Sequence, residues 1–119
     1  MNKKILVIDD DKDILEPILL ILEEEGYTVT AMQKVEHGYK KIEELKPNLI
    51  LLDMLISGSD GRTICKDFKK NAKLKNTPIV MMSAHPGAAK ASKACGADSF
   101  LAKPFETTDL INIVKKFLQ

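Results

Sequence analysis

The sequence predicts an α/β protein in which a parallel sheet of five strands is covered by helices on both faces. Short apolar runs typical of strands alternate five times with segments whose apolar residues recur at helical spacing. Two of the short runs, residues 5–8 and 49–52, contain no polar position. Such runs are typical of central strands that are buried on both faces of a parallel sheet. Right-handed crossovers between these strands give a doubly wound (βα)₅ domain.

The first half of the chain supplies three strands and two helices. In order, these are a strand at 3–8, a helix at 12–26, a strand at 27–32, a helix at 35–46 and a strand at 49–53. The first helix stops at Gly26 and the second is closed by Pro47, both common helix boundaries. Pro17 lies inside the first helical pattern and removes one backbone hydrogen bond, so a kink or a loosened first turn is expected there.

The second half of the chain continues the alternation. In order, it contains a helix at 61–72, a strand at 78–83, a helix at 88–96, a strand at 99–102 and a helix at 107–119. Ile64 and Phe68 share one face of the first of these helices, and Pro78 opens a strand at a position where a missing N–H is tolerated. The segment 88–96 has only small apolar residues, so its helix should be short or loosely packed. Residues 57–61, SGSDG, are a loop by composition.

The composition is that of an ordinary globular domain, and we expect one domain over 1–119. A net charge of +1 and the absence of a basic block disfavour nucleic acid or an anionic membrane as the main partner. No apolar run approaches the roughly 20 residues that span a bilayer. The apolar run near the N-terminus has four residues and is followed by three aspartates, so it is too short for a signal peptide. A cytoplasmic protein is expected. Cys65 and Cys95 form no metal-binding motif and are interpreted as small buried hydrophobes in a reducing compartment.

Acidic and polar residues gather where the predicted strands end, which is where ligands bind in such folds. The residues at these ends are Asp9, Asp10 and Asp11 after the first strand, Asp53 on the third, Ser83 on the fourth and Lys103 after the fifth. Some have ordinary explanations, because Asp10 or Asp11 could cap the first helix and Lys103 could be a surface lysine. Asp53 is harder to explain in this way, since a carboxylate that closes an apolar strand costs several kcal/mol unless it is compensated.

Taken together, these residues predict a divalent-cation site. Neighbouring carboxylates repel one another, and a hard dication such as Mg²⁺ takes one or two carboxylates together with a phosphate oxygen. Lys103 adds a compact positive charge suited to a phosphoryl oxygen, and Ser83 offers a hydroxyl donor. A carboxylate can act as a nucleophile towards phosphorus and form an aspartyl phosphate. Asp53 is the candidate nucleophile.

With these motifs in place, the chain resembles the receiver domain of two-component response regulators over essentially its whole length. The matching pieces are ILVIDDDKDI, LILLDMLISGSDG, IVMMSA and ADSFLAKPF, which occur in this order inside the (βα)₅ pattern. The resemblance implies a flavodoxin-like sheet with strand order 2-1-3-4-5. It also implies a phosphorelay signalling module that catalyses only its own aspartyl phosphorylation and dephosphorylation. Its partners would be a histidine kinase or phosphotransfer domain and a downstream protein or linked output domain.

The resemblance also assigns roles to individual residues. Asp53 would accept a phosphoryl group from a phosphohistidine, while Asp9, Asp10, Asp53 and the backbone carbonyl of Leu55 would hold Mg²⁺ or Mn²⁺. Ser83 and Lys103 would contact the phosphoryl oxygens. Phe100 matches the aromatic switch position, and its alternative role is that of a core aromatic. Leu55 and His85 match the positions that tune phosphoryl lifetime, although the favoured interpretation of His85 is a plain exposed loop histidine.

Two departures from the family pattern stand out. The usual Met-Pro pair after the phosphoacceptor is replaced by Ile56 and Ser57, and the segment 83–96 is slightly shorter than in the family. The second departure puts the usual output face in doubt.

Two other functions remain open at this point. An aspartyl-phosphate phosphohydrolase would need a second carboxylate two residues after the nucleophile, where this chain has Leu55. A degenerate receiver would bind a partner without phosphorylation. The sequence also leaves open whether the chain is free-standing or one domain of a longer protein.

Overall fold

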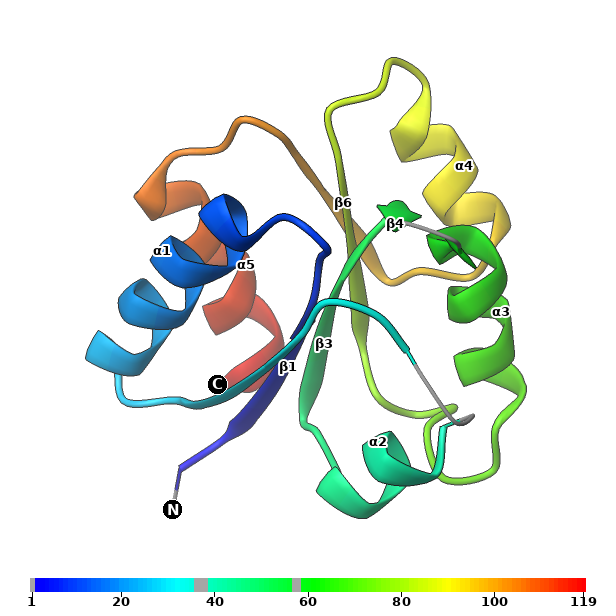
Figure 1. The fold of residues 1–119 in the computed structure, drawn as a ribbon, viewed down its shortest axis with the longest axis horizontal. Helices are drawn as coiled ribbons and strands as arrows, with labels where there is room; N and C mark the ends of the chain where they lie inside the picture. The colour runs from blue at the N-terminus through cyan, green and yellow to red at the C-terminus, as the bar shows by residue number, and fades with distance from the viewer. Residues whose placement is uncertain (1, 36–38, 57–58) are drawn as a thin grey trace.

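A single parallel sheet of five strands forms the centre of the computed structural model, which describes residues 2–35, 39–56 and 59–119. The strand order is β2-β1-β3-β6-β7, which is the predicted 2-1-3-4-5 order once the two short strands β4 and β5 are set aside (Figure 1). The sheet strands are β1 (Lys4–Ile8), β2 (Thr28–Met32), β3 (Leu49–Asp53), β6 (Ile79–Ser83) and β7 (Ser99–Ala102). The predicted doubly wound fold is confirmed.

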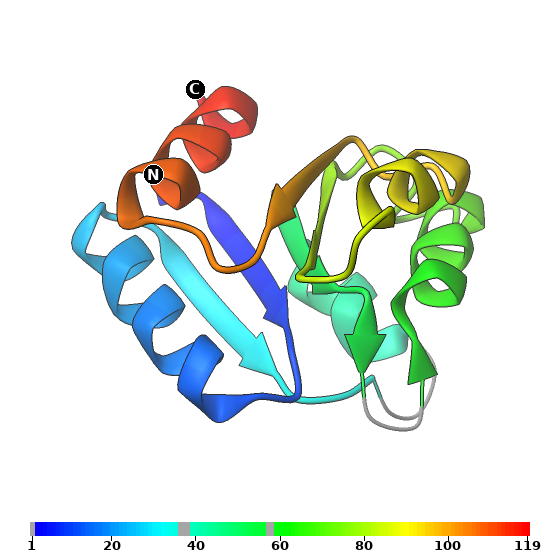
Figure 2. The ribbon, with the colours of Figure 1, turned by 90° about the horizontal axis from the view of Figure 1, so that it is seen from above.

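Within the described residues, five helices cover the sheet. They form two layers, one on each face, which Figure 2 shows from above. The helices are α1 (Lys12–Glu24), α2 (Lys40–Leu45), α3 (Gly61–Lys70), α4 (Ala88–Ala94) and α5 (Thr107–Leu118). Helices α1 and α5 lie on one face, and α2, α3 and α4 lie on the other. Within the described part of the chain, no helix is both long and apolar enough to cross a membrane.

The alternation of side chains along each strand explains why the central strands have no polar position. In β1, Ile5 and Val7 belong to the core shared with α1 and α5, whereas Leu6 and Ile8 belong to the core shared with α2, α3 and α4. All four side chains are fully buried. Each fully buried aliphatic side chain stabilises the fold by roughly 1.5–3 kcal/mol relative to an exposed one. The strand therefore needs apolar residues on both faces.

Helix α1 begins and ends where the sequence predicts. The Asp11 carboxylate accepts the backbone N–H of Asp13 at 2.9 Å, so Asp11 is the N-cap. After the C-cap Glu25, Gly26 adopts a φ of +94°, a conformation that favours glycine. Between these ends the helix runs without a break through Pro17.

Helix α2 is shorter than predicted. It covers Lys40–Leu45 instead of 35–46, and residues 36–38 lie outside the described residues. Tyr39, at the N-cap, packs edge-on against Phe68 and donates its hydroxyl proton to Asp67 at 2.6 Å, which ties the start of α2 to α3. The local apolar pattern contains no information on this long-range contact.

The segment after β3 is also more regular than its composition indicates. Strand β4 (Leu55–Ile56) pairs antiparallel with β5 (Ser59–Asp60), so the prediction of a loop is wrong at 59–60, whereas the helix expected from residue 61 does begin there. Ser57 and Gly58 lie outside the described residues. Ile56 is buried, and its burial anchors the short pairing against the core.

Candidate functional site

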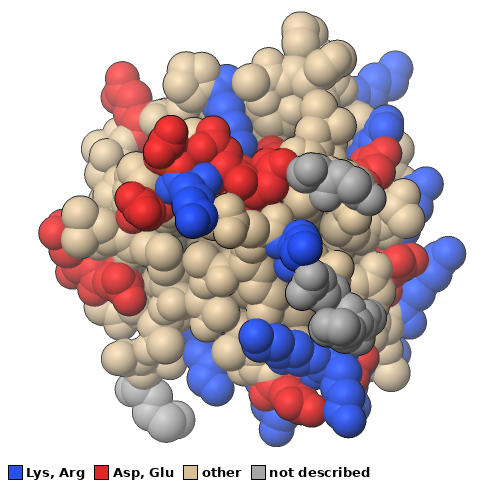
Figure 3. Space-filling model, in the orientation of Figure 1, with Lys and Arg blue, Asp and Glu red and all other residues tan. Residues whose placement is uncertain are grey.

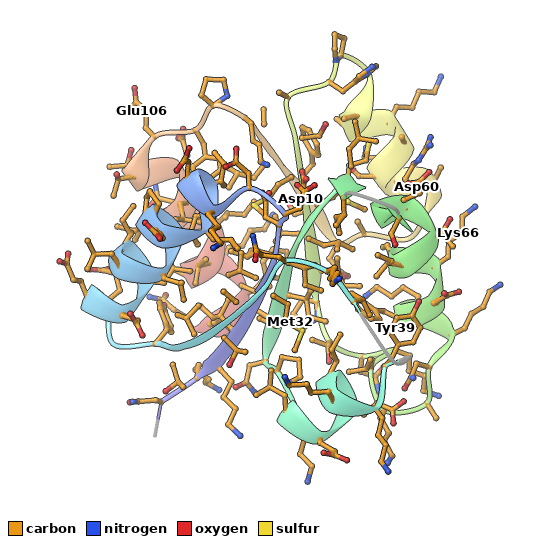
Figure 4. The ribbon with its side chains drawn as sticks, in the orientation of Figure 1. Asp10, Met32, Tyr39, Asp60, Lys66 and Glu106 are labelled. Carbon is orange, nitrogen blue, oxygen red and sulfur yellow. The ribbon has the colours of Figure 1, made fainter. Side chains whose placement is uncertain are left out.

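The register of the sheet brings the predicted acidic residues together. Strands β1 and β3 run parallel with Ile8 opposite Leu52, so Asp9 and Asp53 follow at the same edge. Oxygen atoms of Asp9, Asp10 and Asp53 all lie within 4.8 Å of one another. Asp10 lies where the chain leaves β1 (Figure 4), and acidic side chains gather on this part of the surface (Figure 3). The predicted convergence of these three carboxylates is therefore present.

The three carboxylates differ in burial. Asp9 is completely buried, Asp53 is 7% exposed, and Asp10 is the least buried of the three. The buried Asp9 side chain is held by the backbone N–H of Asp11, which donates to its Oδ1 atom at 3.0 Å. We refer to this group, with Asp9 and Asp53 buried and Asp10 nearer the surface, as the acidic pocket.

Lys103 supplies the positive charge of this pocket. Its Nζ atom lies 2.6 Å from Asp9 Oδ2 and 3.1 Å from Asp53 Oδ1. The Lys103 backbone N–H donates to the Ser83 carbonyl at 2.9 Å and so extends the β6–β7 pairing beyond Ala102. Burial acts to lower the pKa of Lys103, but hydrogen bonding to Asp9 and the charges of Asp9 and Asp53 outweigh burial and raise it. Lys103 is therefore a charged lysine inside the pocket and not a surface residue.

One lysine does not compensate three carboxylates. Burial and then the negative charge of Asp9 raise the pKa of Asp53 above its ordinary value of 3.8, although Lys103 acts in the opposite direction. The ionised form of Asp53 is thus disfavoured in the folded protein. A further positive charge would stabilise the pocket.

This shift predicts how a neutral side chain at position 53 affects stability. Because the folded-state pKa of Asp53 is raised, its stabilising contribution is present below its ordinary pKa of 3.8 and is lost as the pH rises through the folded-state pKa. Without a divalent cation, Asp53→Asn should therefore unfold at a higher temperature than the wild type at neutral pH. The difference should disappear under acidic conditions. Thermal unfolding followed by circular dichroism at both pH values checks this, and a less stable variant at neutral pH would contradict it.

Ser83 ends β6 beside the carboxylates. Strand β6 pairs with β3 so that Met82 lies opposite Asp53, and Ser83 is the next residue. The side chain of Ser83 is buried, and its Oγ atom accepts the backbone N–H of His85 at 3.0 Å. Accepting this bond leaves the hydroxyl proton available for another acceptor.

The three remaining predicted residues are not members of the acidic group, and they differ in burial. Phe100 is partly buried on β7 and packs against the core shared with α2, α3 and α4, as the core-aromatic interpretation expects. Leu55 is 59% exposed on β4. His85 is exposed, and its Nδ1 atom lies 2.8 Å from the Pro86 carbonyl. The switch role of Phe100 and the lifetime roles of Leu55 and His85 stay predictions.

The sequence did not assign a role to Gly61, whose backbone lies against the end of β3, the strand that carries Asp53. Its N–H donates to the Met54 carbonyl at 2.7 Å, and a Cβ atom placed on it would lie only 2.3 Å from the Asp53 carbonyl oxygen. Asp60, just before it, caps α3 by accepting the Arg62 N–H at 2.9 Å. In the sequence, the Asp-Gly pair at the start of a helical pattern could have pointed to this glycine. The close approach of the Gly61 and Asp53 backbones is visible only in the fold.

The fold and the site together define a class of protein, namely a doubly wound α/β domain with a group of three carboxylates and a lysine at the carboxyl edge of its sheet. The model of the response regulator receiver domain matches residues 5–115, and the chain belongs to this family. Receiver domains are signalling modules of two-component systems and typically bind Mg²⁺ in an acidic pocket; Asp9, Asp10 and Asp53 form such a group here.

Solved structures agree with the family assignment. A protein from Chloroflexus aurantiacus that is proposed to be a response regulator is 32% identical, with a TM-score of 0.92 over 99% of this chain and 98% of that one. A two-component response regulator from Clostridium difficile is also 32% identical, with a TM-score of 0.88 over 98% and 96% of the two chains. NtrX from Brucella abortus is 30% identical with a TM-score of 0.88; the match covers 99% of this chain but 27% of the longer NtrX chain.

Proposed function

We propose that this receiver domain accepts a phosphoryl group on Asp53 from a phosphohistidine of a histidine kinase or phosphotransfer domain, and that the resulting change controls a partner. The observation that carries the proposal is the placement of Asp53. Its carboxylate is buried at the end of β3, shares a pocket with Asp9 and Asp10, and is contacted by the ammonium group of Lys103 at 3.1 Å. A nucleophile, a source of charge neutralisation and a rigid mount are thus present together.

The donor set of the pocket fits Mg²⁺ or Mn²⁺. The three carboxylates offer only oxygen atoms, and these lie within 4.8 Å of one another. Ligands of an octahedral ion at about 2.1 Å are roughly 3–4 Å apart, so the side chains need only small movements to reach that geometry. Asp9, Asp10, Asp53 and the carbonyl of Leu55 would hold the ion. Such an ion neutralises negative charge on the transferring phosphoryl group.

In the proposed step, a carboxylate oxygen of Asp53 attacks phosphorus. The new O–P bond forms while the N–P bond of the phosphohistidine breaks, and the leaving imidazole nitrogen keeps the electron pair and takes a proton. Lys103 would neutralise charge on a phosphoryl oxygen, and the Ser83 hydroxyl would donate to another. The reaction is therefore mostly a matter of position and charge, which suits a site built on strand ends.

The proposed output begins at Ser83. Its Oγ atom now accepts the His85 N–H, so a turn of the hydroxyl towards a phosphoryl group would alter the segment that leads into α4. Phe100 would change its packing in response, and a downstream protein or a linked output domain would detect the change. A phosphohydrolase with turnover on an outside substrate is disfavoured, because Leu55 stands where the second carboxylate would be needed.

Intact mass measured after incubation with a small acyl phosphate tests the proposal. The wild type should gain one phosphoryl group in the presence of Mg²⁺ and none after the metal is removed with a chelator. Asp53→Asn should gain none under either condition. Asp60→Asn is the matched control, because Asp60 is a nearby carboxylate outside the acidic group and Asn caps a helix as well as Asp does.

Two outcomes would contradict the proposal. One is labelling that persists in Asp53→Asn. The other is no labelling of the wild type under conditions in which another receiver domain is labelled, which would favour a module that binds its partner without phosphorylation.

A further inference from the structure

The two cysteines of the chain meet at the end of α4. Cys65 lies in α3 and Cys95 follows α4, and these two helices lie side by side (Figures 1 and 2). The Cys65 thiol donates to the Cys95 carbonyl at 3.5 Å, and the Cys95 thiol donates to the Ser92 carbonyl at 3.1 Å. One acceptor, Ser92, lies in the last turn of α4, and the other, Cys95, is the C-cap of that helix. The two sulfur atoms therefore approach the same turn of backbone from α3 and from α4.

The thiols are buried, and they interact with each other. Cys65 is fully buried and Cys95 is 4% exposed, and both belong to the core shared by α3 and α4. Burial, followed by hydrogen bonding between the two side chains, raises the pKa of Cys65 to about 12. Because the thiolate is the reactive form of a cysteine, this shift slows the reaction of Cys65 with oxidants.

A cleft gives access to this pair from the surface. The cleft lies between α3 and α4, has a volume of about 240 Å³, and has Cys95 in its wall. Beside Cys95, which is 4% exposed, the lining side chains from α4 are those of Ala91 and Ala94, both of which are small. Arg62 and Lys66 of α3 line the same cleft together with Asp60, which forms an ion pair with Arg62 at 2.7 Å. The positive charge of Lys66 is left in excess and favours the approach of an anionic reagent. Lys66 is labelled on the outer side of α3 in Figure 4.

We propose that Cys65 and Cys95 form a reversible disulfide that ties α3 to the end of α4, with an anionic low-molecular-weight disulfide as the oxidant. The Cys95 thiolate attacks one sulfur of the reagent, forms a mixed disulfide and releases the first thiol. The Cys65 thiolate then attacks Cys95 Sγ, forms the internal bond and releases the second thiol. The protein loses two protons and two electrons, which together are two hydrogen atoms, and the reagent gains them as two thiols.

The bridge would restrain a helix that is otherwise held by few contacts. Helix α4 has seven residues, its buried residues are Ala88 and Ser92, and no side chain caps its N-terminus. A covalent bond at its C-terminal end closes the chain from 65 to 95 into a loop and limits how far α4 moves from α3. This consequence does not depend on phosphorylation of the protein.

Oxidised glutathione, an anionic peptide disulfide, is the probe that tests the proposal. After incubation the protein is unfolded, its remaining thiols are alkylated, and its intact mass is measured. The wild type should lose two hydrogens and take no alkyl group, and dithiothreitol should restore two alkylation sites. Oxidised protein should also melt at a higher temperature than reduced protein. Two alkyl groups on the treated wild type would overturn the proposal, as would a disulfide formed only between two chains.

The single variants separate an internal bond from unspecific oxidation. Cys65→Ala should stop at a mixed disulfide on Cys95, because Cys95 lines the cleft and has lost its partner. Cys95→Ala should remain reduced, because Cys65 is fully buried. Neither variant should lose two hydrogens or gain thermal stability on treatment. A loss of two hydrogens from either single variant would overturn the assignment of the pair.

Discussion

Replacing Lys103 by methionine should lower the free energy of unfolding by roughly 3–5 kcal/mol at neutral pH when no divalent cation is present. Lys103 Nζ lies 2.6 Å from Asp9 and 3.1 Å from Asp53, and its side chain is only 15% exposed. Methionine keeps much of the apolar stem but removes the charge. Two buried carboxylates would then face each other without a cationic partner, which costs far more than losing an exposed ion pair.

Chemical denaturation measures this effect, and two comparisons make it specific. Lys90→Met changes an exposed lysine of α4 and should be close to neutral. Adding Asp9→Asn to Lys103→Met should recover part of the lost stability, because it removes one of the uncompensated charges. Mg²⁺ should likewise stabilise Lys103→Met more than it stabilises the wild type. A loss no larger than that of Lys90→Met would show that the lysine does not hold the acidic pocket together.

The second large effect is expected for Gly61→Ala, which should cost roughly 1–3 kcal/mol of stability and displace the nucleophile. A Cβ atom at position 61 would lie 2.3 Å from the Asp53 carbonyl oxygen and 2.8 Å from Met54 Cα. Both contacts are with backbone atoms, so no side chain can rotate to relieve them. Either the start of α3 or the end of β3 has to move, and the second movement changes the position of Asp53.

Thr63→Ala is the matched control for this substitution, since Thr63 is an exposed residue of the same helix. Chemical denaturation should separate the two variants by more than 1 kcal/mol, the low end of the cost expected for overpacking. Phosphorylation by a small acyl phosphate should be slower in Gly61→Ala than in Thr63→Ala. Equal stability of the two variants would mean that the backbone adjusts freely here and that Gly61 does not fix the strand end.

Much of this structure follows from local patterns. Residues 5–8 and 49–52 are apolar at every position, and the sheet buries them on both faces as expected. Once these strands are neighbours in parallel, Asp9 and Asp53 must meet at their ends, because strand ends share one edge. The acidic group was therefore predictable from the strand order and from the positions of the aspartates at the ends of the strands. For Lys103, the sequence predicts that it belongs to the site but not which carboxylates it contacts.

The features that could not be predicted depend on contacts between segments distant in sequence. The ammonium group of Lys103 forms ion pairs with both Asp9 and Asp53, and these contacts depend on the three-dimensional path of the chain after β7. Helix α2 begins at Lys40, and Tyr39 before it contacts Asp67 and Phe68 of α3; apolar periodicity carries no information on these contacts. The pairing of β4 with β5 arises because Ile56 is anchored in the core, although the adjacent residues have a loop composition.

The cysteines illustrate the same limit. Sequence spacing indicated two small buried hydrophobes, and both residues are indeed buried. Nothing in their spacing shows that Cys65 and Cys95 approach the same turn of α4. Their proximity follows from how α3 and α4 pack against the sheet and against each other.

The central claim is that a phosphoryl group resides on the carboxylate of Asp53, and reductive trapping tests it most directly. Borohydride converts an aspartyl phosphate to homoserine but leaves phosphoesters and free carboxylates unchanged. After reaction with a small acyl phosphate and Mg²⁺, reduction and digestion, peptide sequencing by mass spectrometry should find homoserine at position 53. Homoserine at another aspartate, or a phosphoryl group that survives reduction on serine or histidine, would contradict the account.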